Sequence, residues 1–484
     1  MSDTIGTVLR TRAGLDKAMV VDTATALTYA ELDSGTATVA AGLVGTGITK
    51  GTRVGLLMPN GTDWVLLALA VARLGAVLVP LSTLLTPDEL HAQLRMAAVE
   101  HLIAVEEFRG RRYPIRQETL PALRRIWGVR DALTLNGTGP LPQVRPADPL
   151  AIMFTSGSSG APKGVLHSHG NALAAVRSGL AARCVTADTR LYLPMPFFWV
   201  GGFGAGILSV LLAGATLVTE ALPTPQSTLA LLQRERVTLF RGWPDQAEAL
   251  ARHTGPLPTL LPGSLEALLT PDLRSRPGAR ASLFGMTESF GPYCGYPADT
   301  DMPESAWGSC GKPFTGMDVR ITDLDTGAPA PVGTVGQIQI RGPHVLRGIC
   351  RRSREDTFTP EGFYPTGDLG HLDADGFLFH HGRCDDMFKV SGATVYPSEV
   401  VRALRGIDGV RAAHVTEVRG RVGAAVVTDR TVEHLRSAAR DMLSHFKIPT
   451  VWLVLTDEDD LPRGATGKVD VTGLRALLSK SQEP

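Results

Sequence analysis

The N-terminal part of the sequence alternates between helix-like and strand-like segments, and this alternation constrains the fold more than any other feature. Residues 28–44 carry apolar side chains at helical spacing, with Thr28 placed to cap the helix and Glu31 three residues later. An apolar run, a second helical segment and a second apolar run follow at residues 52–59, 64–75 and 76–81. Alternation of this kind predicts βαβ units around a largely parallel sheet.

The later part of the chain changes character twice. Residues 315–341 alternate apolar and polar positions between turns rich in Asp, Gly and Pro, which predicts a small β region over about 315–380. After Gly382, two helices and two strands are expected at residues 396–407, 431–446, 412–418 and 423–429. We therefore expect an α/β fold with a large N-terminal domain, residues 1–384, and a small mobile α+β domain, residues 385–484.

Charge, cysteine content and hydropathy exclude several classes of protein. The 484 residues include 48 Lys plus Arg and 48 Asp plus Glu, and a net charge of zero argues against binding to nucleic acid or to an anionic membrane. Five cysteines without a CxxC pair predict neither a disulfide framework nor a zinc site, and make a reducing cytoplasm the expected compartment. The uncharged residues 200–218 approach the length of a membrane span, but glycines interrupt them, so we predict a buried helix followed by a strand.

One short segment concentrates the chemical groups that bind phosphate. The apolar run LAIMF predicts a buried strand, and TSGSSGAPKG continues directly from it. Glycine lets backbone amides approach an anion, hydroxyl groups add donors and lysine adds charge, whereas the alternative is a flexible linker. The spacing fits neither the GxxxxGK[ST] loop nor the GxSxG nucleophile turn. The candidate phosphate-binding residues are Thr155, Ser156, Gly157, Ser158, Ser159, Gly160 and Lys163.

This segment resembles a signature of the adenylate-forming superfamily, which includes acyl- and aryl-CoA synthetases, firefly luciferase and peptide-synthetase adenylation domains. Four more segments resemble the other motifs of that family, in its order: FGMTE from Phe284, YPTGD from Tyr364, GRCDDMFKVSG from Gly382 and PRGATGK from Pro462. Together they cover about residues 150 to 470. The resemblance implies that a carboxylate attacks the α-phosphate of ATP in the presence of Mg²⁺ and that CoA then accepts the acyl group.

The resemblance implies catalytic roles for three residues. Lys468 would bridge the substrate carboxylate and the α-phosphate, because two anions must be neutralised and aligned for the reaction. Thr287 would donate its hydroxyl to the α-phosphate. Glu288 would hold Mg²⁺ against the triphosphate, since a hard cation prefers carboxylate oxygen. Outside its motif, Lys468 would read as a solvated lysine of the C-terminal tail.

Further roles concern the nucleoside and the movement of the C-terminal domain. Phe284 would stack on adenine, with plain core packing as the alternative. Asp368 would accept from both ribose hydroxyls, with a donor from Arg383 on the same ribose. Asp385 occupies the family's hinge position, although an ordinary turn carboxylate is the alternative. Gly392 would keep a pantetheine tunnel for CoA open.

The sequence departs from the family pattern around the acid. Trp199 occupies the place where the family often has histidine, so its role would be steric or apolar, or it would be a core aromatic. The SLEAL stretch at residues 264–268 replaces a small-residue stretch. The candidate pocket residues are Phe198, Trp199, Gly202, Trp243, Met286 and Phe290. This apolar set favours an apolar carboxylic acid over an amino acid, for which Asp245 is the nearest amine partner.

The acceptor of the acyl group is less constrained than the first step. The sequence shows no carrier-protein segment with a serine tether, so free CoA is favoured as the acceptor. A separate carrier protein, an amine or another small nucleophile is the alternative. A non-catalytic nucleotide-binding protein is a different class, which the presence of Lys468, Glu288 and Asp368 opposes. The oligomeric state is left open, a homodimer included.

Overall fold

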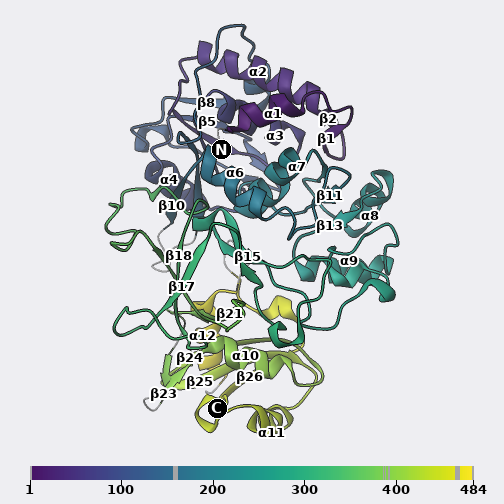
Figure 1. The fold of residues 1–484 in the computed structure, drawn as a ribbon, viewed down its shortest axis with the longest axis vertical. Coiled ribbons are helices and arrows are strands. Elements are labelled where there is room, and N and C mark those ends of the chain that lie inside the picture. Colours follow the sequence, from purple (N-terminus) through teal and green to yellow (C-terminus); the bar gives the residue numbers. More distant parts are fainter. Residues whose placement is uncertain are drawn as a thin grey trace. The chain divides into compact units, whose positions relative to one another are not determined.

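The computed structural model describes residues 3–155, 162–384, 386, 388–390, 393–463 and 469–481 (Figure 1). Its elements group into two compact units. Unit 1 consists of Met1–Val319, Ile340–Tyr364 and Asp375–Leu378, and unit 2 of Arg320–Gln339, Pro365–Ala374 and Phe379–Pro484. The domain boundary predicted between residues 384 and 385 rests on a hinge at Asp385, which lies outside the described residues, and it stays a prediction.

A seven-stranded sheet is the larger sheet of unit 1, with its strands in the order β19-β10-β9-β4-β3-β5-β8. Pairing is parallel from β9 through β4, β3 and β5 to β8, and antiparallel between β9 and β10 and between β10 and β19. The largely parallel sheet predicted from the alternation is confirmed. The strands, in sheet order, span Gly348–Ile349, Lys163–Ser168, Pro149–Thr155, Val77–Pro80, Arg53–Leu57, His101–Ala104 and Arg125–Gly128.

Helix α2, at Tyr29–Gly45, begins where the sequence predicts. The hydroxyl of Thr28 accepts from the backbone N–H of Glu31 at 3.1 Å, and the Glu31 carboxylate accepts from the backbone N–H of Thr28 at 2.8 Å. This reciprocal capping satisfies two N–H groups that have no partner within the helix. The other helices of unit 1 are α1 (Ile5–Arg12), α3 (Thr62–Arg73), α4 (Pro87–Met96), α5 (Val129–Leu133), α6 (His169–Ser178), α7 (Ser209–Ala213), α8 (Pro225–Arg234) and α9 (Pro244–Thr254).

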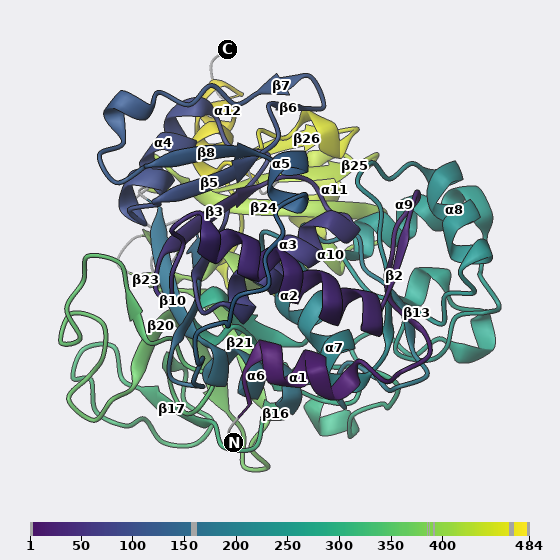
Figure 2. The same ribbon diagram turned by 90° about the horizontal axis from the view of Figure 1, so that it is seen from above.

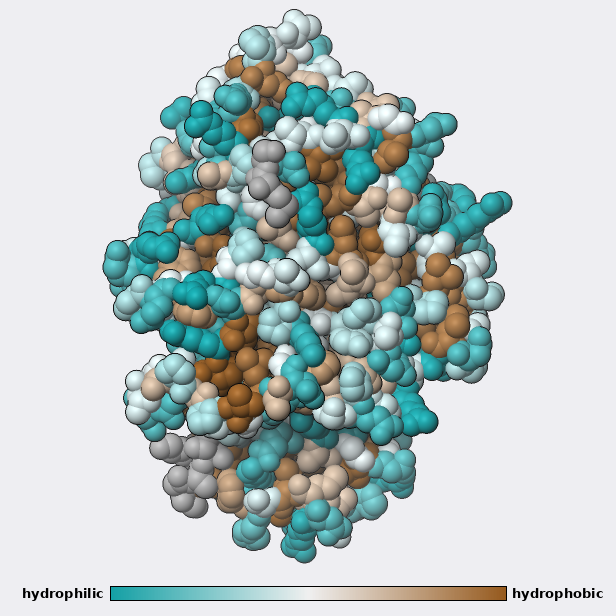
Figure 3. All heavy atoms as spheres, viewed as in Figure 1, coloured by the Kyte–Doolittle hydropathy of each residue, from teal (hydrophilic) through white to brown (hydrophobic). Residues whose placement is uncertain are grey.

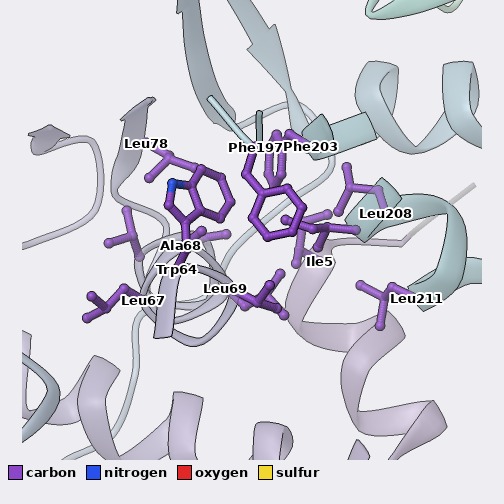
Figure 4. Close-up of a cluster of buried hydrophobic side chains, with 14 of the residues drawn as sticks. Ile5, Trp64, Leu67, Ala68, Leu69, Leu78, Phe197, Phe203, Leu208 and Leu211 are labelled. Carbon is purple, nitrogen blue, oxygen red and sulfur yellow. The ribbon is translucent and has the colours of Figure 1, made fainter. Parts of the chain in front are cut away.

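The core of unit 1 forms around helix α3, which lies beside α2 (Figure 2). Trp64 on α3 is fully buried, and its ring meets the rings of Phe197 and Phe203 edge-on, with centroids 5.4 and 5.8 Å apart (Figure 4). Edge-to-face packing of this kind stabilises a core beyond the burial of apolar area alone. This contact with the core fixes the segment that carries Phe197.

A second, five-stranded sheet of unit 1 has the order β13-β11-β12-β1-β2 and is parallel except between β1 and β2. Its strands span Leu239–Phe240, Arg190–Tyr192, Thr216–Val218, Ala18–Val21 and Ala26–Thr28. Residues 200–218 form the π-helix η2 (Gly201–Leu208), then α7 and β12, so the predicted buried helix followed by a strand is confirmed. Within the described part of the chain, no helix has the length and apolar character needed to cross a membrane.

Smaller elements complete unit 1. A three-stranded sheet joins β14 (Phe284–Met286), β15 (Gly291–Gly295) and β16 (Lys312–Pro313), with the 3₁₀ helix η5 (Thr287–Ser289) between its first two strands. A hairpin pairs β6 (Glu107–Phe108) with β7 (Arg111–Arg112). Further 3₁₀ turns span Gln117–Thr119, Glu266–Leu268, Pro271–Leu273 and Glu304–Ala306. Hydrophobic residues reach the face drawn in Figure 3 in separate groups among hydrophilic ones.

Unit 2 contains the predicted α+β elements. The β region is a four-stranded sheet of order β17-β18-β20-β21, whose strands Asp318–Thr322, Gly336–Arg341, Tyr364–Leu372 and Leu378–Arg383 include residues of both units. A second sheet joins β24 (Val410–Val418), β25 (Arg421–Thr428) and β26 (Val451–Leu455). The remaining elements are β22 (Phe388–Val390), β23 (Ala393–Val395), α10 (Pro397–Arg405), α11 (Val432–Met442), α12 (Val471–Lys480) and 3₁₀ turns at His445–Lys447 and Glu458–Asp460.

Helix α11 ends at Met442, sooner than the helical pattern to residue 446 predicts. Leu443 leaves the helix in an extended conformation and is buried in the core of unit 2. The following 3₁₀ turn brings the ammonium of Lys447 to the carboxylate of Glu399, with 2.6 Å between Nζ and Oε1. The burial of Leu443 and the ion pair of Lys447 are tertiary contacts, and they override the helical spacing of the local sequence.

Candidate active site

The predicted phosphate loop joins two antiparallel strands. Thr155 ends β9 and Lys163 begins β10, and these two residues pair with each other in the sheet. The strand predicted before the loop is thus present, and the chain returns along it rather than entering a helix. Both described ends of the loop lie at one end of a hairpin. The loop positions Ser156, Gly157, Ser158, Ser159 and Gly160 lie outside the described residues.

The FGMTE segment forms β14 and the 3₁₀ helix η5. Phe284 is half-buried, and its ring meets the ring of Tyr293 edge-on, with 5.6 Å between centroids. Gly285 permits the close pairing of β14 with β15, because a Cβ there would lie 2.1 Å from the carbonyl oxygen of Gly291. After η5, Phe290 turns the chain with φ 51°, a left-handed conformation that is uncommon for a large side chain.

Glu288 on η5 is a buried carboxylate with few partners. It is 4% exposed, and its Oε1 accepts a hydrogen bond from the hydroxyl of Tyr364 at 3.1 Å. No lysine or arginine among the described residues forms an ion pair with it. A second buried glutamate, Glu220, accepts instead from three hydroxyl groups, of Tyr192, Ser227 and Thr228. A buried carboxylate normally has such a set of donors, so Glu288 retains acceptor capacity for a cation.

The donor chemistry at Glu288 fits Mg²⁺. Among the described residues, no group of three or more His, Cys, Asp or Glu side chains could hold a metal ion by itself. Mg²⁺ commonly binds through one or two carboxylates together with substrate phosphates and water. A single buried carboxylate on η5, which contacts the strand β9 that leads into the predicted phosphate loop, fits such an arrangement.

His167, which the sequence analysis did not identify, fixes the backbone of the same segment. Its Nε2 donates to the carbonyl oxygen of Thr287 at 2.8 Å. Its Nδ1 therefore accepts, and Asn171 donates to it at 2.8 Å while also donating to the carbonyl oxygen of His344 at 3.0 Å. Burial lowers the pKa of His167 to about 4, so the ring is neutral at pH 7. The network joins β10, α6 and η5.

Three buried histidines predict that acid destabilises the protein. Burial lowers the pKa of His167, His169 and His344 to about 4 each, whereas an unfolded histidine titrates near about 6.5. Between these values the unfolded chain binds more protons, so the free energy of unfolding falls as the pH drops through the window. We expect each ring to contribute about 2 kcal/mol to the loss between pH 7 and pH 5.

Urea melts of the wild type and of His167→Gln at pH 7 and pH 5 measure this contribution. Comparison of the two losses removes any difference in stability that the substitution causes at both pH values. The variant should lose about 2 kcal/mol less than the wild type. Equal losses would contradict a neutral, buried His167.

The predicted pocket residues form two groups. Phe198, Trp199 and Trp243 make a row of edge-to-face ring contacts, with centroids 5.3 and 5.7 Å apart. Phe290 is 1% exposed and instead packs against the ring of His167, with centroids 4.9 Å apart. Met286 is half-buried at the end of β14.

Two further features bear on the predicted pocket. The backbone packing requires glycine at position 202, because a Cβ there would lie 2.1 Å from the carbonyl oxygen of Pro196. The unusual 264–268 stretch runs beside β13, because Leu265 donates to the carbonyl oxygen of Phe240 at 3.1 Å and Ser264 accepts from the backbone N–H of Phe240 at 3.1 Å. The stretch therefore lies beside β13, the edge strand of the five-stranded sheet.

In unit 2, the structure brings Asp368 and Arg383 together. Asp368 is 8% exposed, and its Oδ1 lies 3.4 Å from Nη1 of Arg383 and 3.8 Å from Nε2 of His380. Gly367 adopts φ +77°, and a Cβ there would lie 2.8 Å from the Arg383 guanidinium. The predicted ribose-binding pair is therefore an adjacent pair on strands β20 and β21.

Three predicted residues lie outside the described part of the chain: Asp385, Gly392 and Lys468. The residues that flank the last of these are described. Arg463 and Val469 form an antiparallel bridge, and Asp470 donates to the carbonyl oxygen of Pro462 at 2.8 Å. Residues 462–463 and 469–470 are thus held next to each other.

Comparison with known proteins gives consistent matches along the chain. A family model described as AMP-binding enzyme matches residues 10–350. A 3-[(3aS,4S,7aS)-7a-methyl-1,5-dioxo-octahydro-1H-inden-4-yl]propanoyl:CoA ligase of Mycobacterium tuberculosis is 32% identical, and the match covers 90% of this chain and 91% of the relative. A feruloyl-CoA synthase of Amycolatopsis sp. is 32% identical, and the match covers 92% of each chain.

The fold matches solved structures as well. An O-succinylbenzoate coenzyme A synthetase of Bacillus subtilis, solved in complex with ATP and a magnesium ion, is 25% identical to this chain. The two superpose with a TM-score of 0.82 over 99% of this chain and 100% of the other.

Proposed function

This chain belongs to the AMP-binding enzyme family, and on that premise we propose that it ligates a carboxylic acid to CoA through an acyl-adenylate. ATP and Mg²⁺ serve the first step, and the products are acyl-CoA, AMP and pyrophosphate. The relatives named above as CoA ligases and synthases support this reaction class. The five free cysteines support a reducing compartment, such as the cytoplasm, as its place of work.

One observation carries the proposal: the buried carboxylate of Glu288 keeps free acceptor capacity beside a backbone segment that His167 fixes. Bound at Glu288, Mg²⁺ would neutralise phosphate charge. The hydroxyl of Thr287 would donate to the α-phosphate. Because His167 fixes the carbonyl of Thr287, both side chains are held on a backbone that needs little reorganisation when ATP binds.

The first step joins two anions. A carboxylate oxygen of the acid attacks the α-phosphorus, the bond from that phosphorus to the bridging oxygen breaks, and pyrophosphate leaves with the electron pair. We assign to Lys468 the bridge between the two anionic groups, and to the backbone amides and hydroxyls of residues 155–160 the charge of the triphosphate. Asp368 and Arg383 receive the ribose hydroxyls, and Phe284 stacks on adenine.

The second step transfers the acyl group. The sulfur of CoA, deprotonated on attack, adds to the acyl carbonyl carbon, and AMP departs as the leaving group. In this proposal residues 385–484 turn about Asp385 between the two steps, which withdraws Lys468, and Gly392 leaves room for the pantetheine arm. The acid itself would lie among the rings of Phe198, Trp199 and Trp243, which favours a substrate with an apolar body.

Pyrophosphate release across a panel of aliphatic, cyclic and aromatic acids tests the proposal. Each acid is incubated with ATP and Mg²⁺, with and without CoA, and the product is identified by mass. Release that depends on the acid and rises with CoA, together with a thioester product, is expected. Acid-dependent release that ignores CoA would keep the adenylation step and exclude CoA as the acceptor. ATP binding without release for any acid would contradict the proposal.

Replacing Trp199 with alanine is expected to change the order of preferred acids more than the KM for ATP. The ring contacts Phe198 and Trp243, so its loss would enlarge the space for the acid and cost about 1–3 kcal/mol of discrimination between acids. Kinetics on the active members of the panel would measure this. Trp307→Ala is the matched control, because its ring belongs to neither pocket group. Its Nε1 donates a hydrogen bond to the carbonyl oxygen of Met302. An unchanged order of acids with a lowered Tm would make Trp199 a core residue only.

A further inference from the structure

Arg183 carries a buried positive charge that no carboxylate of the described residues balances. The residue follows α6 and is 4% exposed. The one hydrogen bond of its side chain among the described residues runs from Nη1 to the carbonyl oxygen of Val176, over 3.4 Å, and the guanidinium forms no ion pair with any of them. An arginine has five N–H donors, so most of its capacity is unused. A buried charge without partners lowers the stability of the folded chain, so the guanidinium of Arg183 calls for a partner that binds there.

Two residues without side chains make room for the guanidinium of Arg183. A Cβ on Gly179 would lie 2.3 Å from Nη1 of Arg183. On the other side, a Cβ on Gly291 would lie 3.6 Å from Nη2 and 3.7 Å from Val200. Nη2 therefore lies near Gly291, which in turn lies near Val200. Gly291 directly follows Phe290, and Val200 directly follows Trp199. These are the two chain segments to which the sequence assigns the acid pocket.

The surroundings of Arg183 add positive rather than negative charge. Burial and the charge of Arg241 lower the pKa of Arg183 to about 10, so the group stays protonated at pH 7. Arg241 donates to the carbonyl oxygen of Gly263 at 2.6 Å. His344 is 1% exposed and its Nδ1 has no partner among the described residues, while burial, with a smaller effect of Arg183, lowers its pKa to about 4. Nothing described here neutralises the two arginines.

We propose that Arg183 binds an oxygen acceptor, a carboxylate or a carbonyl, at the end of the acid substrate remote from its reacting carboxylate. This inference rests on the proposed acid activation and names the class of acid within it. The substrate then has an apolar body between the aromatic rings and an oxygen at its far end. The acceptor satisfies the unused donors of Arg183 in a charge-assisted hydrogen bond.

A purely structural role for Arg183 makes a different prediction. The carbonyl oxygen of Val176 already accepts from the backbone N–H of Gly179 at 3.2 Å, so the contact of Arg183 is a second, longer one at the end of α6. If capping of this helix were its whole role, loss of Arg183 would lower stability and reduce activity equally for all acids. Selectivity between acids separates the two roles.

The test compares acids that share one carbon skeleton and end in a methyl, a carbonyl or a carboxylate group. Wild-type kcat/KM, from pyrophosphate release, should be at least about 10-fold higher for an oxygen-ended acid than for its methyl-ended match. In Arg183→Met the oxygen-ended acids should lose about 10- to 100-fold and the methyl-ended acids less than about 3-fold. The carbonyl and carboxylate arms identify which acceptor is bound.

Two further variants keep the test sharp. Gly179→Ala displaces the guanidinium without removing it, at a backbone with an ordinary φ of −90°, and should shift selectivity in the same direction. Arg177→Met removes an arginine of α6 that pairs with Asp3 and should leave selectivity unchanged. Equal losses for all acids in Arg183→Met, or a wild type that prefers methyl-ended acids, would overturn the inference and leave acid activation standing.

Binding without catalysis separates the inference from the proposed function. An oxygen-ended acid should raise the Tm of the wild type and not that of Arg183→Met. If no acid drives pyrophosphate release, the proposed function fails, and the Tm shift still decides whether Arg183 binds the acceptor. Absence of the shift in the wild type would overturn the inference.

Discussion

Replacing Lys468 with alanine is expected to abolish formation of the acyl-adenylate while leaving transfer from a preformed adenylate to CoA largely intact. In the proposed reaction both the carboxylate and the α-phosphate are anionic, and this lysine is the charge that spans them. Loss of such an electrostatic contact should lower the rate of adenylation by about 1,000-fold or more. The second half-reaction has a neutral acyl carbonyl as its electrophile and does not need the bridge.

The two half-reactions can be measured separately. Adenylation is followed by pyrophosphate release in a single turnover, and transfer by thioester formation from a synthetic acyl-adenylate and CoA. Lys480→Ala is the matched control, since Lys480 is an exposed lysine in the last turn of α12. Its loss should cost no more than about 1 kcal/mol of helix stability. If Lys468→Ala slowed both half-reactions equally, the proposed division of labour would be wrong.

Replacing Glu288 with glutamine is expected to lower the rate of adenylation by about 100- to 1,000-fold and to raise the concentration of Mg²⁺ required. The substitution keeps the shape of the side chain and removes the charge that would hold the cation. Because glutamine is neutral, it avoids the cost of burying a carboxylate whose one described donor is Tyr364. The Tm of the variant should therefore equal or exceed that of the wild type.

Glu220→Gln is the control that separates metal binding from the loss of any buried carboxylate. Glu220 is also buried, but hydroxyl groups of three residues satisfy it. Its replacement should lower stability and leave the Mg²⁺ dependence of adenylation unchanged. Wild-type Mg²⁺ dependence in Glu288→Gln would remove Glu288 from the proposed metal site.

Features set by local sequence were predictable. The start of α2 follows from Thr28 and Glu31, whose interactions span three residues, and the strand before the phosphate loop follows from a continuous apolar run. The contact between Asp368 and Arg383 is consistent with the family resemblance, which assigns residues of two separate motifs to one ribose, and that binding role stays a prediction. In the first two cases neighbouring residues contain the necessary information, and in the third the resemblance to a family supplies it.

Features set by long-range contact were not predictable. The hydrogen bond from His167 to Thr287 joins residues 120 positions apart, and neither residue type at its own position indicates the other. Arg183 belongs to a residue type that is mostly exposed, so composition gives no reason to expect it in the interior. The end of α11 at Met442 likewise depends on where Leu443 and Lys447 find their partners. These long-range contacts cannot be predicted from a single sequence.

The hydrogen bonds around His167 also constrain how the chain can acquire its activity during synthesis. The ring needs the carbonyl of Thr287, and its partner Asn171 needs the carbonyl of His344, 173 positions further along the chain. Residue 344 must therefore emerge from the ribosome before these hydrogen bonds can form, long after β9 and β10 have emerged. Until then His167 and Asn171 lack these two carbonyl partners, and a chain with such unpaired polar groups is the kind of intermediate that chaperones bind. Fragments truncated between residues 170 and 340 should accumulate as aggregates rather than as folded, inactive protein.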